Sequence, residues 1–315
     1  MTLLLHRPTG RVWSDGTDAG NPGGVMSWHP GTGEVRRFAD DPQLAAFADG
    51  RLYGVSDDGS LVAVGRPVVH RGSKVDLAVV RLSDGAELLR TKRHLVYDVV
   101  FGAGGDVLLV EAFRSKPRRY VFDAASGGFD DRGELGIDYR TFTGERDPLA
   151  NRFLSSAEGA AGRVISTDLV NGEVDEVTVP IPGVVRSIQF LGGGERLLVQ
   201  SEEGVHCLTE RWEPVWDAPV VGKVHVVPDG SLVCVEQFST AHNPWGVEIV
   251  LDAVTGARVS QIESFEGRGR LACGLTGTAM LLHGGRSLDL ASGEVSDAIV
   301  VPGFVEPREK DWAWG

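Results

Sequence analysis

Two stretches near the end of the chain repeat one phrase: Leu251-Asp252-Ala253-Val254-Thr255-Gly256-Ala257-Arg258 and Leu288-Asp289-Leu290-Ala291-Ser292-Gly293-Glu294-Val295. Each copy is the end of an apolar strand, a tight turn closed by glycine, and the start of a strand with alternating polar residues. Related copies close at Gly33, Gly85, Gly127 and Gly172. A degenerate copy without glycine, Cys207-Leu208-Thr209-Glu210-Arg211-Trp212-Glu213, fills the gap between Gly172 and Gly256 and brings the copies to seven.

The spacing of these copies predicts the architecture. Successive glycines lie 52, 42, 45, 84 and 37 residues apart, and the step of 84 spans the degenerate copy. The average step is about 43 residues, which is the length of a four-stranded propeller blade. A pair of β-sandwiches, the other all-β architecture, would not require one phrase to recur in this way. The sequence therefore predicts an all-β chain folded as a single seven-bladed β-propeller of four-stranded antiparallel blades.

A second phrase, half a period away, joins two apolar strands through an Asp-Gly or Gly-Gly turn. It occurs at 47–52, 99–110, 188–199 and 226–233. Asp-Gly supplies the positive-φ positions of a tight hairpin, and no stretch keeps a 3.6-residue apolar period, so helix should be nearly absent. We predict one domain over residues 1–315, with approximate blades at 2–38, 44–90, 95–134, 137–179, 184–218, 222–264 and 270–301.

Composition agrees with a fold that has many turns. The chain has 42 glycines in 315 residues, well above the usual ~7%.

The apolar run at the start is too short for a signal peptide, and no other run is long enough to span a membrane. Cys207, Cys234 and Cys273 all lie in apolar strand-like segments. An odd number of cysteines in such segments favours reduced, buried thiols and a cytoplasmic protein.

The seven-fold phrase resembles the repeat of the WD40 and YVTN-type β-propeller superfamily over essentially the whole chain. The Gly-His dipeptide typical of WD40 blades is missing from the sequence. The resemblance therefore implies the architecture and no particular subfamily's activity. Propellers of this kind serve both as scaffolds and as enzymes, so the fold alone does not choose between these functions.

Charge is distributed unevenly along the chain. The whole sequence has 31 basic and 44 acidic residues, a net charge of −13, whereas residues 66–119 contain eleven basic and six acidic residues. A basic patch on an acidic body focuses positive potential over a small area and indicates an anionic partner. The alternative is a solvated surface whose charges contact neighbouring carboxylates.

Blade geometry predicts where these basic residues lie. If the strands of a blade are named A to D in chain order, the B–C and D–A connections emerge on one face of a propeller. The long connections of this chain are B–C connections, and binding residues are often carried by such loops. We expect neighbouring connections on this face to hold Arg66, Arg71 and Lys74 (B–C of blade two), Lys92 and Arg93 (the following D–A), and Arg114, Lys116, Arg118 and Arg119 (B–C of blade three).

A late B–C connection, residues 240–245, is the second candidate for contact with a ligand or partner. His242, Asn243 and Trp245 combine a titratable ring, an amide and an aromatic side chain there. An ordinary surface turn is the alternative.

Motifs for catalysis and metal binding are missing from the sequence. The polar stretch 15–21 lacks the bidentate Glu of a calcium loop, and the histidines form no His-x-His or His-Glu-x-x-His pair of the kind that binds zinc. No Gly-x-Ser-x-Gly elbow or P-loop occurs. We therefore predict no metal and no cofactor, and the sequence assigns no catalytic residue.

The leading interpretation is a cytoplasmic, non-catalytic binding module or scaffold that uses its B–C/D–A face to hold an acidic protein segment or an anionic small molecule. Outside residues 66–119 the chain has 20 basic and 38 acidic residues, a net of −18, which opposes an extended nucleic acid duplex. Few aromatic residues accompany the patch to stack on bases. The alternative is a propeller enzyme, a metal-dependent lactonase-like hydrolase or a lyase acting at the channel mouth.

Overall fold

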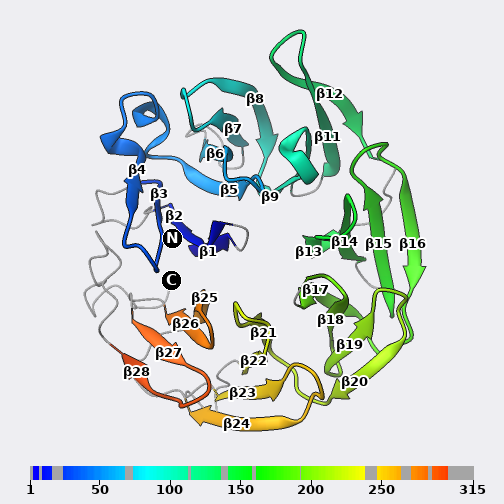
Figure 1. Cartoon of the computed structure of the whole chain (residues 1–315). Coiled ribbons are helices and arrows are strands. Elements are labelled where there is room, and N and C mark those ends of the chain that lie inside the picture. Colours follow the sequence, from blue (N-terminus) through cyan, green and yellow to red (C-terminus); the bar gives the residue numbers. More distant parts are fainter. Residues whose placement is uncertain are drawn as a thin grey trace. The chain divides into compact units, whose positions relative to one another are not determined.

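Seven four-stranded sheets make up the fold (Figure 1). The computed structural model describes residues 3–6, 9–15, 24–67, 74–112, 115–135, 141–157, 161–191, 193–237, 247–263, 271–282 and 286–296. Apart from the strands, this part of the chain has short 3-10 turns, which include η2 (Phe38–Asp40), η3 (Ala45–Phe47) and η4 (Ala103–Gly105). No helix in these residues is long and apolar enough to cross a membrane.

Each sheet is one blade, built from four strands that follow one another in the chain. The blades, in chain order, are β1–β4 (Leu3–His6, Arg11–Ser14, Met26–Trp28, Val35–Arg37), β5–β8 (Arg51–Val55, Leu61–Pro67, Lys74–Arg81, Glu87–His94), β9–β12 (Val96–Phe101, Val107–Ala112, Ser115–Asp123, Gly128–Glu134), β13–β16 (Thr141–Arg146, Arg152–Ala157, Arg163–Asp168, Val174–Thr178), β17–β20 (Val185–Leu191, Arg196–Ser201, Val205–Thr209, Pro214–Ala218), β21–β24 (Lys223–Val226, Leu232–Gln237, Val247–Asp252, Arg258–Glu263) and β25–β28 (Leu271–Thr276, Ala279–Leu282, Ser287–Asp289, Val295–Ser296). The predicted all-β, seven-bladed propeller of four-stranded antiparallel blades is confirmed.

The phrase that recurs in the sequence forms the hairpin between the third and fourth strands of a blade. The amide of Gly293 donates to the carbonyl of Asp289 at 2.8 Å, and the amide of Gly172 donates to the carbonyl of Asp168 at 2.9 Å. In both turns the aspartate side chain also accepts two backbone N–H groups. These glycines have φ of +76° and +79°, a conformation that other residues adopt at a cost.

The degenerate copy in blade five forms the same kind of turn with different residues. Its hairpin is closed by a hydrogen bond of 2.9 Å from the amide of Thr209 to the carbonyl of Glu213. The Thr209 hydroxyl accepts the amide of Glu213 at 3.2 Å in place of an aspartate side chain. Trp212 takes a positive φ of +66° and packs against buried residues of blades four and five.

The second phrase forms the hairpin between the first and second strands in blades three, five and six, at 99–110, 188–199 and 226–233. The copy at 47–52 does not. There η3 ends at Phe47, and β5 begins at Arg51 after a D–A connection. The corresponding hairpin of blade two lies at Asp57–Gly59 instead, where the Asp58 side chain accepts the amide of Ser60 at 2.9 Å.

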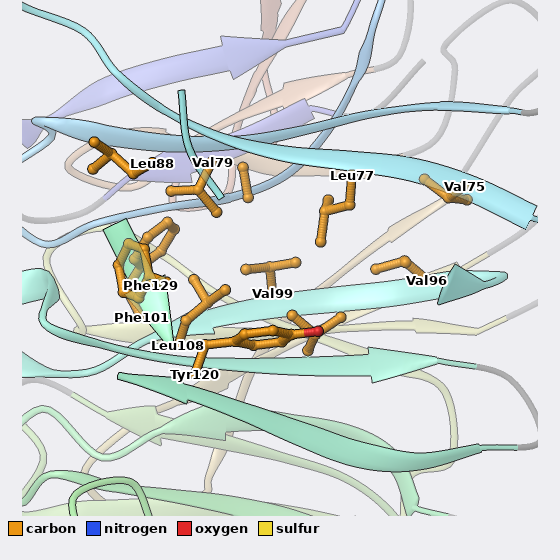
Figure 2. Close-up of a cluster of buried hydrophobic side chains, with 12 residues drawn as sticks. Val75, Leu77, Val79, Leu88, Val96, Val99, Phe101, Leu108, Tyr120 and Phe129 are labelled. Carbon is orange, nitrogen blue, oxygen red and sulfur yellow. The ribbon is translucent and has the colours of Figure 1, made fainter. Parts of the chain in front are cut away.

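Layers of apolar side chains between neighbouring sheets form the core. Figure 2 shows one layer, in which Leu77 and Val79 of blade two face Val99, Leu108 and Tyr120 of blade three. Similar layers lie between blades three and four, four and five, six and seven, and one and seven. Each strand presents alternate residues to opposite faces of its sheet, so a blade between two others is apolar on both faces.

The chain forms two compact units. One contains residues 1–52, 225–252 and 258–315, and the other contains residues 53–224 and 253–257. In the second unit, the turn 253–257 packs on blade five: the indole Nε1 of Trp216 donates to the carbonyl of Ala253 at 3.1 Å. The single domain over 1–315 stays a prediction.

Candidate functional site

The basic residues of blades two and three lie on strands. Lys74 begins β7, Lys92 and Arg93 are near the end of β8, and Lys116, Arg118 and Arg119 are near the start of β11, while Arg66 is in β6. Their predicted placement in connections was wrong. β7, β8 and β11 are eight, eight and nine residues long, and exposed strand positions accept charged side chains without ending the strand.

Five of the candidate residues lie outside the described residues, so their placement stays a prediction: Arg71, Arg114, His242, Asn243 and Trp245.

One group of charges joins blade two to blade three. We call Arg93, Lys116, Arg118, Asp131 and Glu134 the inter-blade cluster. The Nη2 of Arg93 donates to the main-chain carbonyl of Lys116 at 3.2 Å, and its Nη1 lies 4.0 Å from Oε1 of Glu134. Nε of Arg118 donates to Oδ1 of Asp131 at 2.7 Å. The structure thus brings Arg93 together with β11.

The charges of this cluster offset one another. Burial acts to raise the pKa of Asp131, but hydrogen bonds from Arg118 and from the Gly133 amide outweigh it and lower that pKa. The same bond raises the pKa of Arg118. The Arg93 side chain is only 11% exposed. The cluster therefore holds two blades together and offers a partner little uncompensated charge.

A second group lies on the opposite face of β8. We call Arg66, Lys74, Arg90 and Lys92 the outer basic face; all four are exposed and lie around Asp76. Across the sheet, Asp76 is directly opposite both Arg66 and Lys92. Nη2 of Arg90 donates to Oδ2 of Asp76 at 3.0 Å, and its Nη1 donates to Glu87 at 3.0 Å.

The surrounding positive charges lower the pKa of Asp76. The hydrogen bond from Arg90 is the main cause that lowers the pKa of Asp76, and the charges of Arg90, Lys92 and Arg66 add to it against the effect of burial. Three basic groups thus act on one partly buried carboxylate. The outer basic face keeps a net positive charge after its internal pairs are formed.

Arg119 does not join either group. Its guanidinium donates to the main-chain carbonyls of Leu169 and Val170, in the third-to-fourth-strand turn of blade four. Its neighbours Arg118 and Tyr120 point to the other side, towards blade two, because successive strand residues face opposite ways. The expected convergence of Arg119 with Arg93 was therefore wrong.

Buried titratable residues are the part of the molecule that sequence reasoning missed. Glu111 and Glu236 each occupy the second-to-last position of an apolar second strand, and each is 7% exposed. Glu111 lies opposite Asp98 across β9 and β10, and Oε2 of Glu236 lies 3.3 Å from Nε2 of His225. A single acidic residue in an otherwise apolar strand is the signal that could have found them.

Ser201 and His206 resemble a nucleophile and its base, at 3.0 Å between Oγ and Nε2. The Ser201 side chain is fully buried, and its hydroxyl also accepts the amide of Glu203 at 3.1 Å. Burial lowers the pKa of His206 against the charges of Asp217 and Glu203. This arrangement closes a tight connection in blade five and leaves no hydroxyl accessible to a substrate.

In the part of the chain that the structure describes, no group of three His, Cys, Asp or Glu side chains is placed to hold a metal ion.

Comparison with known proteins identifies the architecture. No protein-family model and no curated protein matches the sequence. Among solved structures, the β-propeller domain of Myceliophteria thermophila Cps50 (Swd1) matches with a TM-score of 0.62 at 12% identity, over 94% of this chain and 95% of that one. A putative 6-phosphogluconolactonase from Bacteroides fragilis NCTC 9343 matches with a TM-score of 0.59 at 14% identity, over 91% of this chain and 93% of that one. Another from Bacteroides uniformis ATCC 8492 matches with a TM-score of 0.62 at 12% identity, over 91% of this chain and 94% of that one. At such identities the likeness concerns the fold alone, and the chain is a seven-bladed β-propeller.

Proposed function

We propose that the chain is a non-catalytic binding module that holds an anionic partner, an acidic protein segment or an anionic small molecule, on blades two and three. The observation that carries this proposal is the outer basic face. Its four exposed basic residues lie around one partly buried carboxylate, on a rigid sheet. Such an arrangement favours negative charge on a partner and speeds its encounter with the protein.

The two groups of basic residues have different roles in this proposal. Lys74 and Lys92 are exposed on the outer basic face and would touch the partner, and Lys116 stays in the proposed contact set on sequence grounds. Arg93 and Arg118 would position the strands that carry them, because both are engaged in the inter-blade cluster. Arg71 and Arg114, with the segment of His242, Asn243 and Trp245, stay in the proposed contact set on sequence grounds.

Nucleic acid fits this surface less well than an acidic peptide or a small anion. The chain outside residues 66–119 has a net charge of −18, from 20 basic and 38 acidic residues. An extended duplex would bring its own dense negative charge close to that body. A short acidic segment needs only the outer basic face.

Fluorescence anisotropy with a labelled poly-glutamate peptide tests the proposal. The wild-type protein should bind, and binding should weaken as salt rises, because exposed charges are screened over ~8 Å at physiological ionic strength. The double variant Lys74→Glu/Lys92→Glu should bind about tenfold more weakly, from two lost attractions of up to ~1 kcal/mol each. Lys223→Glu, an exposed lysine of blade six, is the matched control and should bind like the wild type.

Two outcomes would overturn the binding proposal. One is wild-type protein that does not bind the peptide, and the other is a double variant that binds as well as Lys223→Glu. Elemental analysis addresses the enzyme alternative separately. A divalent ion that co-purifies with the protein and is lost to a chelator would favour a metal-dependent enzyme.

A cytoplasmic location is part of the same proposal. Cys207 and Cys234 are both buried, and burial raises the pKa of the Cys207 thiol to about 11. A thiol with so high a pKa stays protonated and unreactive at neutral pH. These cysteines are of the kind found in reducing compartments.

A further inference from the structure

The strand β8 is the edge of its sheet. Blade two has the strand order β5-β6-β7-β8, and β8 pairs with β7 from Lys74 opposite His94 to Val80 opposite Glu87. An edge strand has a second side on which its backbone N–H and C=O groups point away from the sheet. At eight residues, β8 is long enough to pair with another extended segment.

Blade three covers only one face of β8. Tyr120 of β11 donates its hydroxyl to Thr91 at 3.4 Å, and Arg93 donates to the carbonyl of Lys116. Leu88 packs into the layer of apolar side chains between the two blades (Figure 2). These contacts hold β8 against blade three, so that an added strand would not have to order it.

The opposite face of β8 is exposed and basic. Arg90, Lys92 and His94 occupy every second position and are all exposed, which places them roughly 6.6 Å apart along one side of the strand. Asp76 and Glu87 hold Arg90 by salt bridges. No described residue forms an ion pair with Lys92 or Lys74, so these two ammonium groups are the ones that an incoming carboxylate would meet.

We propose that an acidic segment of a partner protein binds in extended conformation along β8 as a fifth strand of blade two. Main-chain hydrogen bonds would set the register, and carboxylates at alternate positions of the segment would face the lysines of the outer basic face. This inference rests on the proposed function, because it names the partner class for the same surface. Lysines on an edge strand also guard against aggregation between edges, and the experiment separates the two roles.

The experiment compares synthetic peptides of equal composition. One alternates glutamate and threonine, a second carries the same residues as a glutamate block followed by a threonine block, and a third is the alternating peptide with alternate backbone amides N-methylated. Affinity for the full-length protein is measured by calorimetry. Isotope-edited infrared spectroscopy of a carbonyl-labelled peptide reports whether the bound segment is a β-strand.

Strand addition predicts a clear order of affinities. The alternating peptide should bind at least about fivefold more tightly than the block peptide, since each exposed ion pair formed in register contributes up to ~1 kcal/mol. N-methylation on the edge that pairs with β8 should abolish binding, and the bound carbonyl should shift to a β-sheet frequency. Lys92→Glu should weaken the alternating peptide roughly fivefold, while Arg132→Glu on β12, the outer strand of blade three, should not.

The possible failures are distinguishable. Equal binding of all three peptides, with salt dependence but no β-sheet signal, would overturn strand addition and leave the anionic binding surface intact. Tighter binding of a single-stranded oligonucleotide than of any peptide would show that the partner is a nucleic acid, and would also overturn it. No binding of any peptide would overturn the proposed function itself. Lys92→Thr that binds the alternating peptide normally but self-associates would assign the lysine to protection of the edge alone.

Discussion

At the scale of single residues, the carboxyl group of Asp98 is the clearest case in which the fold disturbs an ionisation. The residue keeps part of its surface exposed, but its carboxyl group lies beneath surrounding atoms. Burial raises its pKa to about 6, and only the hydrogen bond from the amide of Val99 acts in the other direction. Asp98 lies opposite Glu111 at the same end of blade three, where a second carboxylate is buried.

This pKa predicts how stability depends on pH. The folded-state pKa of about 6 lies above the ~3.9 of an unfolded aspartate. The contribution of Asp98 to the free energy of unfolding should therefore fall as pH rises from about 4 to 6 and stay level above that range. Asp98→Asn, which carries no charge, should be more stable than the wild type at pH 7 by about 3 kcal/mol, and equally stable at pH 4.

Thermal unfolding of both proteins across this pH range is the check. Asp106→Asn, an exposed aspartate of the adjacent hairpin, is the control and should keep the wild-type pH profile. Parallel profiles for Asp98→Asn and the wild type would show that the Asp98 carboxylate is not desolvated.

Substitution of two hairpin glycines distinguishes the free-energy cost of a strained backbone from the cost of a steric clash. Gly256 and Gly33 have φ of +71° and +70°. A Cβ on Gly256 would lie 2.6 Å from ring atoms of Trp216, whereas a Cβ on Gly33 would have no atom within 4 Å. Gly256→Ala should thus lower the free energy of unfolding by about 3 kcal/mol and Gly33→Ala by about 1 kcal/mol. Equal losses in chemical denaturation would contradict the packing of this turn on Trp216.

At the scale of elements, local patterns could be predicted from the sequence, and contacts between blades could not. The turn from Asp289 to Gly293 is specified by residues close together in the chain. The Asp289 side chain accepts the amide of Ala291, and the amide of Gly293 donates to the Asp289 carbonyl. The position of Lys92 in β8 is different. A polar, charged segment of sequence suggests a connection, yet β7 pairs with β8 continuously from Leu89 to His94. The hairpin predicted at 47–52 was also wrong, because Asp49-Gly50 follows the 3-10 turn η3 and not a strand.

Arg119 and Lys92 should give opposite results, because one belongs to the contact between blades and the other to the outer basic face. Arg119→Ala removes hydrogen bonds to the Leu169 and Val170 carbonyls. It should lower the free energy of unfolding by about 2 kcal/mol and leave poly-glutamate affinity unchanged. Lys92→Glu should weaken the affinity and alter stability by less than ~0.5 kcal/mol. Denaturant titration and anisotropy of both variants test the pair, and weakened binding by Arg119→Ala in a folded protein would contradict this division.

At the scale of the whole molecule, the number of blades was predictable because each blade carries its own copy of the repeated phrase. The candidate site was predictable only in part. The excess of basic residues over 66–119 is visible in the sequence, but the ion pairs that neutralise Arg118 and Arg90 come from strands 13 to 14 residues away. The pairs of buried side chains, such as His225 with Glu236, also form only once two strands lie side by side.

Hydrogen exchange of the full-length protein, with and without poly-glutamate, tests the central claim most directly, because it locates the bound anion without any substitution. We predict slower exchange in β7, β8 and β11, strongest in Glu87–His94, and unchanged exchange in Lys223–Val226 and the other strands of blade six. Saturating poly-glutamate that protects other blades, or protects none, would contradict the assignment of the binding surface to blades two and three.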